Sequence, residues 1–253
     1  MNVVWDPDKY LSFRAHRDRP AHDLLARVPE RSARRVVDLG CGAGNLTSLL
    51  TARWPDAAVE ATDSSPEMVE AARARGVDAQ VEDVRDWKPS PDTDVVLCNA
   101  VLQWVPEHPE LLRSWLPELP QGASFAFQVP GNFDSPSYAA IRELVAQPQW
   151  AAEGLLRADS VLGPQGYAEL IADLGLGVDA WETTYVQRLE GPDPVLEWLS
   201  GTALRPVRAS LDEQGWAEFR AELGARLRAA YPRRSDGTTW FPFRRVFAVA
   251  HRL

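Results

Sequence analysis

A glycine-rich segment is the part of this sequence best suited to hold a ligand. Glycines stand at Gly40, Gly42 and Gly44, between the apolar run 35–39 and a helical pattern over 45–53. Glycine adopts backbone conformations that other residues resist, and it lets a ligand approach the main chain closely. A strand, a glycine turn and a helix in this order are typical of nucleotide-type cofactor sites in parallel sheets.

The spacing of these glycines separates two classes of cofactor. A dinucleotide fingerprint has the pattern G-x-G-x-x-G, which would place the third glycine at position 45. Asn45 stands there, and Gly44 comes one residue early. The spacing therefore disfavours a nicotinamide dehydrogenase, as does the lack of an acid and base pair suited to hydride transfer.

Polar residues follow the next three apolar runs. Asp63 ends the second run, where a carboxylate can accept both hydroxyls of a ribose, and Asp83 follows the third, where it can accept from an adenine amino group. Asn99 ends the fourth run. Because parallel sheets bind ligands at the carboxyl ends of their strands, we expect these side chains to line one crevice. The alternative for Asp63 and Asp83 is a cap or a turn.

The elements that must position these residues alternate between strand and helix from residue 35 to 130. This alternation predicts right-handed βαβ units and a parallel sheet. The second helix has a start signal in Ser64 and Ser65 before Pro66, and a stop at Gly76. The expected strands are 35–39, 57–62, 78–81, 94–99 and 123–129, and the expected helices are 45–53, 66–75 and 107–116.

The second half of the chain has a different pattern. A segment rich in glycine and proline contains two helical stretches, a longer strand follows, and two further helices precede a final strand. We expect helices at 136–146, 166–174, 192–200 and 211–231, and strands at 179–187 and 243–251. This predicts a single domain made of an N-terminal arm (1–34), a cofactor-binding core (35–130), a helical cover (131–178), a helical insert for substrate (188–235) and a final strand (243–252).

Composition and charge exclude several classes of protein. The 253 residues have a net charge of -9, which argues against a non-specific nucleic-acid binder. Residues 36–180 carry eight basic and 22 acidic side chains, whereas both ends are mildly basic. No apolar run approaches the roughly 20 residues that a membrane helix needs, and the first residues lack a signal-peptide pattern. We therefore expect a cytoplasmic protein, a monomer or weak homodimer, with no membrane or nucleic-acid partner.

The glycine segment and its acidic partners resemble the class I S-adenosylmethionine-dependent methyltransferases over residues 36–130. The motif is Asp38-Leu-Gly40-Cys-Gly42-Ala-Gly44-Asn45, followed by Asp63 and by Glu82-Asp83. The resemblance implies a doubly wound, mostly parallel seven-stranded α/β sheet with an antiparallel final strand and a helical insert over the active site. It implies S-adenosyl-L-methionine as cofactor, S-adenosyl-L-homocysteine as product, and no metal. The residues implied to hold the cofactor are Asp38, Gly40, Gly42, Asp63, Ser64, Met68 (or a core residue), Asp83, Val84 and Asn99.

Segments outside the cofactor motifs narrow the resemblance to the trans-aconitate 2-methyltransferases. They are the opening 5–20 (with Trp5-Asp-Pro7, Tyr10-Leu-Ser-Phe13 and Arg17-Asp-Arg-Pro20), Asn99-Ala-Val-Leu-Gln-Trp104, Trp181-Glu-Thr-Thr-Tyr185, Thr202-Ala-Leu-Arg-Pro206 and the closing 245–252. This implies direct methyl transfer to a carboxylate of trans-aconitate, giving a monomethyl ester. Enzymes that methylate malonyl thioesters share the Leu-Gln-Trp segment and the glycine loop, so these two features alone do not decide the substrate.

The chemistry of a carboxylate acceptor agrees with the residues present. An ionised carboxylate needs no catalytic base at pH 7, so positioning and removal of water would be the enzyme's work. We expect no catalytic side chain, with Cys41 and Cys98 as packing residues, and with His22 and His108 as solvated residues on a helix surface or at a helix start.

A polycarboxylate needs arginines to hold it, since guanidinium and carboxylate pair bidentately. The first candidate is Arg205, and the second is Arg244 or Arg245 on the final strand. The resembled ending has Phe-Pro directly before its arginine, whereas here Phe243-Arg244 stands between Phe241-Pro242 and Arg245, so the choice between the two arginines stays open. Further candidates are Arg17 for the carboxylate of the cofactor or the substrate, and Arg19, Trp104 and Tyr10 for the substrate.

Two alternative functions remain at this stage. One is a carboxyl methyltransferase for another small dicarboxylate or tricarboxylate, or for a malonyl thioester. The other is a regulator that binds the cofactor without catalysis, or an inactive paralogue.

Overall fold

The computed structural model of the protein describes residues 14–150 and 161–253. In α2 (Arg14–Leu25), the first helix among the described residues, side chains are described from Arg19 onward. Contacts group the chain into two compact units. The described part of the sheet unit comprises 14–130, 161–183 and 245–253, and that of the helical unit comprises 131–150 and 184–244.

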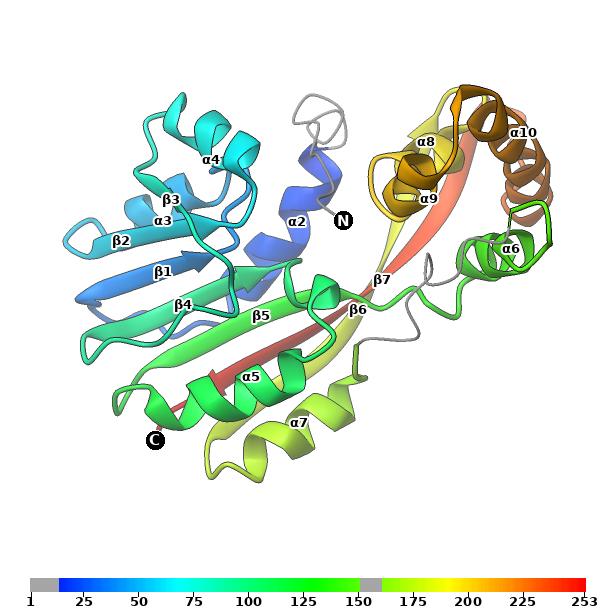
Figure 1. The fold of residues 1–253 in the computed structure, drawn as a ribbon. Helices are drawn as coiled ribbons and strands as arrows, with labels where there is room; N and C mark the ends of the chain where they lie inside the picture. Colours follow the sequence, from blue (N-terminus) through cyan, green and yellow to red (C-terminus); the bar gives the residue numbers. More distant parts are fainter. Residues whose placement is uncertain (1–13, 151–160) are drawn as a thin grey trace. The chain divides into compact units, whose positions relative to one another are not determined.

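The sheet has seven strands in the order β3-β2-β1-β4-β5-β7-β6 (Figure 1). The pairs from β3 to β5 are parallel, and β7 runs antiparallel to β5, which confirms the predicted sheet. The strands β6 and β7 are longer than predicted and run on into the helical unit. The bounds are β1 (Arg35–Leu39), β2 (Ala58–Asp63), β3 (Ala79–Val81), β4 (Thr93–Asn99), β5 (Ser124–Pro130), β6 (Gly177–Glu190) and β7 (Thr238–His251).

The helices of the sheet unit follow the local sequence. In α4, Pro66 occupies the first turn, Ser65 Oγ accepts the backbone N–H of Met68 at 3.3 Å, and Gly76 follows the helix with a φ of 83°. These are the start and stop features that define a helix in sequence. The remaining bounds are α3 (Thr47–Arg53), α4 (Pro66–Arg73), η1 (Leu102–Trp104), α5 (His108–Trp115), η2 (Leu116–Glu118) and α7 (Pro164–Ala172).

One aromatic core joins the sheet to α5 and α7. The rings of Trp87 and Trp115 meet edge to face at 5.4 Å, and Phe127 meets Tyr167 of α7 in the same way at 4.9 Å. All four side chains are buried. Their burial fixes the loop after β3 and the helix α5 against the central strands, beside the edge where Asp83 and Asn99 stand.

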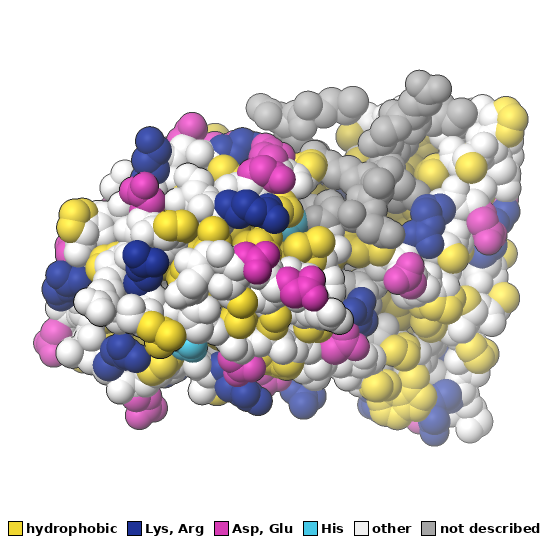
Figure 2. Space-filling model, turned by 90° about the horizontal axis from the view of Figure 1, so that it is seen from below, with side chains coloured by type: hydrophobic (Ala, Val, Ile, Leu, Met, Phe, Trp, Pro, Cys, Tyr) yellow, Lys and Arg dark blue, Asp and Glu magenta, His cyan; other side chains and the backbone are white. Residues whose placement is uncertain are grey.

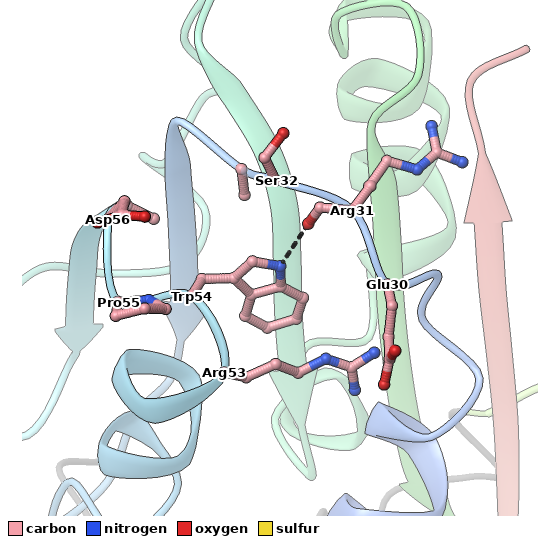
Figure 3. A pocket seen from close by; sticks show the side chains of 9 residues that line it. Glu30, Arg31, Ser32, Arg53, Trp54, Pro55 and Asp56 are labelled. Atoms are coloured by element: carbon pink, nitrogen blue, oxygen red, sulfur yellow. Dashed lines mark hydrogen bonds between the residues drawn. The ribbon is translucent and has the colours of Figure 1, made fainter.

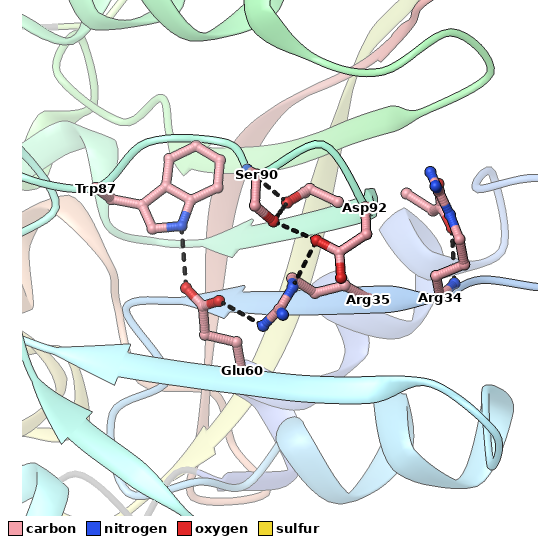
Figure 4. A network of polar contacts seen from close by, with 8 residues as sticks. Arg34, Arg35, Glu60, Trp87, Ser90 and Asp92 are labelled. Carbon is pink, nitrogen blue, oxygen red and sulfur yellow. Dashed lines mark hydrogen bonds and ion pairs between the residues drawn. The ribbon is translucent and has the colours of Figure 1, made fainter.

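A polar network ties the same loop to the start of the sheet (Figure 4). Trp87 Nε1–H donates to Glu60 at 3.2 Å, and Arg35 donates to Glu60 at 3.3 Å and to Asp92 at 3.1 Å. Hydrogen bonds from Arg35 and Ser90 lower the pKa of Asp92 to about 2. Strands β1 and β2 are thus linked to the segment that leads from β3 to β4.

The helical unit has its own core. Trp198, Phe219 and Phe241 are buried at its centre, and Asp212 caps α10 by accepting the backbone N–H of Gly215 at 2.8 Å. The short helix α9 was not predicted, because it has only six residues. The bounds are α6 (Pro136–Val145), α8 (Pro194–Ser200), α9 (Arg205–Ser210) and α10 (Glu213–Ala230).

Charged side chains of both signs are interspersed on the face drawn in Figure 2. No helix among the described residues has the length and apolar character needed to cross a bilayer.

Candidate functional site

The carboxyl ends of the parallel strands bring the predicted cofactor residues to one edge of the sheet. Leu39 pairs with Thr62, Asp63 pairs with Val81, and Asn99 pairs with Gln128. The chain reverses its direction of strand addition between β1 and β4, and ligands of open α/β sheets bind at such a point. The glycine turn after β1 and Asn99 at the end of β4 flank this point.

The three glycines of the turn have left-handed φ values, but they differ in what surrounds them. A Cβ on Gly40 would lie 2.2 Å from Val101 Cγ2, so this position requires glycine for close packing. Among the described residues, a Cβ on Gly42 would meet nothing within 4 Å. Gly42 therefore borders open space, where a ligand can approach the main chain.

Asp63 connects this turn to the start of α4. Its Oδ2 accepts the backbone N–H of Gly42 at 2.9 Å, and its Oδ1 accepts the backbone N–H of Ser65 at 2.9 Å. Burial raises the pKa of the carboxyl, and the two backbone hydrogen bonds oppose that shift. Each carboxylate oxygen has a second acceptor position, so Asp63 can also accept hydroxyl groups of a ligand. Ser64 beside it is exposed, and Met68 is buried.

Asp38 lies beneath the turn. Its side chain is buried and accepts a 2.6 Å hydrogen bond from Thr47 Oγ1 at the start of α3. Burial raises its pKa to about 6, with a smaller contribution from the negative charge of Asp63. Asp38 is thus placed to hold the turn and to add negative charge close to it.

The loop after β3 presents Asp83 and Val84. Both oxygens of Asp83 pair with Arg85 Nη1, at 3.0 and 3.1 Å, and Arg85 also pairs with Glu107. The backbone N–H of Glu82 donates to the carbonyl of Asp63 at 3.0 Å, which joins this loop to the end of β2. Val84 is buried. The loop is therefore held from two sides.

Asn99 takes part in a chain of side-chain hydrogen bonds that we did not predict. Gln128 Nε2–H donates to Asn99 Oδ1 at 2.6 Å, and Arg245 Nη1–H donates to Gln128 Oε1 at 3.1 Å. The one sign of it in the sequence is a glutamine within the otherwise apolar segment Phe125-Ala-Phe-Gln-Val129. Such a residue on a buried strand needs partners.

The two candidate arginines of β7 have different surroundings. Arg245 is 6% exposed and bonded to Gln128, which places it with Asn99 in the sheet unit. Arg244 lies in the helical unit, where its Nη1–H donates to the carbonyl of Gly131 at 3.0 Å. Neighbouring residues of a strand point to opposite faces, so the two side chains diverge.

The other predicted substrate residues are spread over both units. Trp104 is half-buried in η1, Arg19 is exposed on α2, and Arg205 is the first residue of α9 in the helical unit. The side chain of Arg17 and the whole of Tyr10 lie outside the described residues, as does the arm before Arg14.

The sequence is similar to that of known proteins over nearly its full length, and this similarity shows to which family the chain belongs. The methyltransferase domain family matches residues 13–180. Trans-aconitate 2-methyltransferase of Rhodococcus jostii (strain RHA1) is 61% identical over 251 residues, which cover 98% of this chain and 99% of that protein. The enzyme of the same name from Mycobacterium tuberculosis (strain ATCC 25177 / H37Ra) is 54% identical, with 98% and 96% of the two chains covered.

The chain belongs to the trans-aconitate 2-methyltransferase family. This membership confirms the resemblance drawn from the sequence.

Solved structures show the same fold for this member of the trans-aconitate 2-methyltransferase family. YcgJ from Bacillus subtilis has a TM-score of 0.56 at 14% identity, with 92% of this chain and 98% of that chain covered. Phosphoethanolamine N-methyltransferase 2 of Haemonchus contortus, solved with S-adenosyl-L-methionine, has a TM-score of 0.56 at 14% identity. The match covers 93% of this chain and 53% of that chain.

The structure corrects the expectation for His108. The residue is fully buried rather than solvated, because its Nδ1–H donates to the carbonyl of Val105 at 2.8 Å and its Nε2 accepts from the Tyr167 hydroxyl at 2.9 Å. Burial lowers its pKa. Cys41 and Cys98 are buried free thiols whose pKa values burial raises, as expected for packing residues. The described residues contain no group of three or more His, Cys, Asp or Glu side chains suited to a metal.

A cavity of about 380 Å³ lies away from the carboxyl edge (Figure 3). It is formed by residues 30–33, which precede β1, and 53–57, which precede β2. Trp54 Nε1–H donates to the carbonyl of Arg31 at 3.0 Å, and Arg53 donates to the carbonyls of Leu25 and Val28. These contacts pack the chain at the amino ends of the strands, opposite the glycine turn.

Proposed function

We propose that the protein transfers a methyl group from S-adenosyl-L-methionine to a carboxylate of trans-aconitate, forming a monomethyl ester. The observation that carries this proposal is the 61% identity, over almost the full length of both chains, to an enzyme named trans-aconitate 2-methyltransferase. Identity this high spans the helical unit as well as the sheet unit, so it includes the segments outside the cofactor motifs.

The residues at the carboxyl edge fit this cofactor. Gly42 borders open space at the turn, and Asp63 retains acceptor positions for ribose hydroxyls. The excess of acidic over basic side chains in residues 36–180 suits a positively charged sulfonium. When bound, the cofactor supplies an electrophilic methyl group on sulfur. We assign the methionine part to Asp38, Gly40, Gly42, Asn99 and Arg17, the ribose to Asp63, Ser64 and Met68, and the adenine to Asp83 and Val84.

The reaction requires that the carboxylate acceptor be positioned, and it requires no proton transfer. A carboxylate is ionised at neutral pH and attacks without a base. The buried His108 is engaged with Tyr167, and burial keeps the thiols of Cys41 and Cys98 protonated, so these groups serve packing. The chain's contribution is alignment of the acceptor and exclusion of water.

Arginines are suited to the carboxylates that do not react. A guanidinium that pairs bidentately with a carboxylate draws electron density from both of its oxygens and makes them weaker nucleophiles, so the clamps belong on the spectator groups. We assign these clamps to Arg205 and to Arg245 in preference to Arg244, with Arg19 and Tyr10 as further contacts and Trp104 as an apolar wall. The bond from Arg245 to Gln128, and through it to Asn99, supports this preference.

We also propose that the enzyme acts in the cytoplasm, as a monomer or weak homodimer. Two buried free thiols support a reducing compartment.

The test is incubation of the protein with labelled cofactor and a panel of dicarboxylic and tricarboxylic acids. We expect a methyl ester with trans-aconitate and weaker or no product with acids that lack its third carboxylate. A different acid as the best substrate would refute the assignment of trans-aconitate. Absence of transfer to any acid would favour a protein that only binds the cofactor.

A further inference from the structure

We propose that Gln128 is a positioning residue that turns the side-chain amide of Asn99 so that its N–H groups face a carboxylate of a bound ligand. This inference rests on the proposed function and adds a residue to it. It also assigns the two ends of the Asn99 amide, with Oδ1 toward Gln128 and the N–H groups toward the ligand.

The orientation of both amides follows from the chemistry of Arg245. A guanidinium only donates hydrogen bonds, so the atom of Gln128 that lies 3.1 Å from Arg245 Nη1 must be the acceptor Oε1. Gln128 Nε2–H then points to Asn99, and the atom it reaches at 2.6 Å must be the acceptor Oδ1. The donor Arg245, at the end of this series of hydrogen bonds, therefore fixes the orientation of both carboxamides.

The position of Gln128 makes this arrangement rigid. The residue is 1% exposed, and its strand pairs it directly with Asn99. Its backbone carbonyl also accepts the N–H of Ala100 at 2.9 Å. Ala100 has a φ of 59°, which is unfavourable for a residue with a Cβ. Gln128 thus holds the end of β4 through both its side chain and its backbone.

The remaining donors of Asn99 define what it can bind. Because Oδ1 is engaged by Gln128, Nδ2 carries the two N–H groups at the other end of the amide, and none of the described residues accepts a hydrogen bond from it. A donor end of this kind recognises an acceptor such as a carboxylate oxygen. Both ligands of the proposed reaction carry a carboxylate, on the acid and on the methionine part of the cofactor.

Two substitutions reverse this polarity without changing side-chain size. In Asn99→Asp, one oxygen still accepts from Gln128, and the other replaces the N–H groups with negative charge. In Gln128→Glu, one oxygen still accepts from Arg245, and the other accepts only, so the amide of Asn99 turns over and presents Oδ1 to the ligand. Gln128→Met is the control for loss of both hydrogen bonds at similar volume.

Isothermal titration calorimetry measures the effects on two binding steps. S-adenosyl-L-homocysteine is titrated into the free protein, and trans-aconitate is titrated into the protein saturated with that product. We expect Asn99→Asp and Gln128→Glu to weaken one of these steps about tenfold or more, in line with a lost hydrogen bond to a charged group. Binding of 5′-methylthioadenosine, which has no carboxylate, stays within twofold of the wild-type value.

The binding step that is weakened shows whether Asn99 contacts the carboxylate of the cofactor or a carboxylate of the acid. A double-mutant cycle separates positioning from a direct effect of charge. In an Asn99→Ala background, Gln128→Glu has little further effect if it acts by turning Asn99. Two binding steps unchanged in Asn99→Asp, or a full additional effect of Gln128→Glu in the Asn99→Ala background, would overturn the proposal. If trans-aconitate binds to no variant and not to the wild type, the proposed substrate fails, while the titration with S-adenosyl-L-homocysteine still decides the role of Gln128.

Discussion

The backbone N–H of Gly42 donates a 2.9 Å hydrogen bond to Asp63 Oδ2, so the acid that ends β2 is bonded to the glycine turn that follows β1. The other oxygen of Asp63 accepts from Ser65 at the start of α4. One carboxylate therefore fixes two segments that border the proposed cofactor site, and it retains acceptor positions for the ribose.

This double role predicts a large effect of replacing Asp63. We expect Asp63→Ala to weaken binding of S-adenosyl-L-homocysteine about 100-fold or more, because it removes charged acceptors for two hydroxyls and loosens the turn. Asp63→Asn keeps one acceptor for Gly42 and should lose less. Calorimetric titration of folded variants measures both values. Wild-type affinity in Asp63→Ala would show that the ribose lies elsewhere.

The raised pKa of Asp38 predicts an unusual dependence of stability on pH. Its carboxyl has a pKa of about 6 in the folded protein and near 3.8 when unfolded, so the folded state binds the proton more tightly. Stability attached to this group is present below about pH 4 and is lost as the pH rises through 6, by at most about 3 kcal/mol.

Asp38→Asn isolates this effect, because the amide oxygen can still accept from Thr47 and the titration is removed. We expect the variant to be more stable than the wild type at pH 8, by about 2 kcal/mol, and similar to it at pH 4. Urea unfolding at the two pH values gives the difference. An equal effect at both would mean that Asp38 is not destabilised by its charge.

Replacing Arg245 should lower kcat/KM for trans-aconitate more than replacing Arg244. We expect Arg245→Ala to lower kcat/KM for trans-aconitate about 10- to 100-fold, since it removes a charged donor, and Arg244→Ala to change it only slightly. Arg245→Ala also leaves Gln128 Oε1 without its hydrogen-bond donor, so the melting temperature of this variant should be lower than that of the wild type. Steady-state kinetics on both variants makes the comparison. A larger loss in Arg244→Ala would reverse the assignment.

Arg205 has a matched control within its own helix. Arg208 lies on α9 as well, and it pairs with Glu213 of α10. We expect Arg205→Ala to raise KM for the acid about tenfold or more without changing the affinity for S-adenosyl-L-homocysteine, and Arg208→Ala to leave KM within twofold. Equal effects of the two substitutions would indicate a general loss of charge in the helical unit.

The central strands could be predicted because their signals are local. The ends of the five strands from residue 35 to 130 differ from expectation by at most one residue, since each is a short run of strand-forming residues between turn or helix signals. The positions of Asp63, Asp83 and Asn99 at one edge then follow from parallel pairing alone.

Other features depend on contacts between distant segments, which a sequence pattern does not reveal. His108 opens a helix, where polar residues are usually solvated, but Tyr167 from α7 covers it. Gln128 becomes interpretable only when strand pairing places it beside Asn99 and Arg245. The six residues of α9 are too few to show a helical period. Tertiary contacts decided the environment of His108 and of Gln128, whereas α9 was missed because of its length.

The most direct test of the proposed function is mass spectrometry of a reaction that contains the protein, S-adenosyl-L-methionine and trans-aconitate at neutral pH. We expect one equivalent of trans-aconitate monomethyl ester for each S-adenosyl-L-homocysteine formed, and loss of both products in Asp63→Ala. No ester above the control without protein, in a sample that binds S-adenosyl-L-homocysteine, would contradict trans-aconitate methylation.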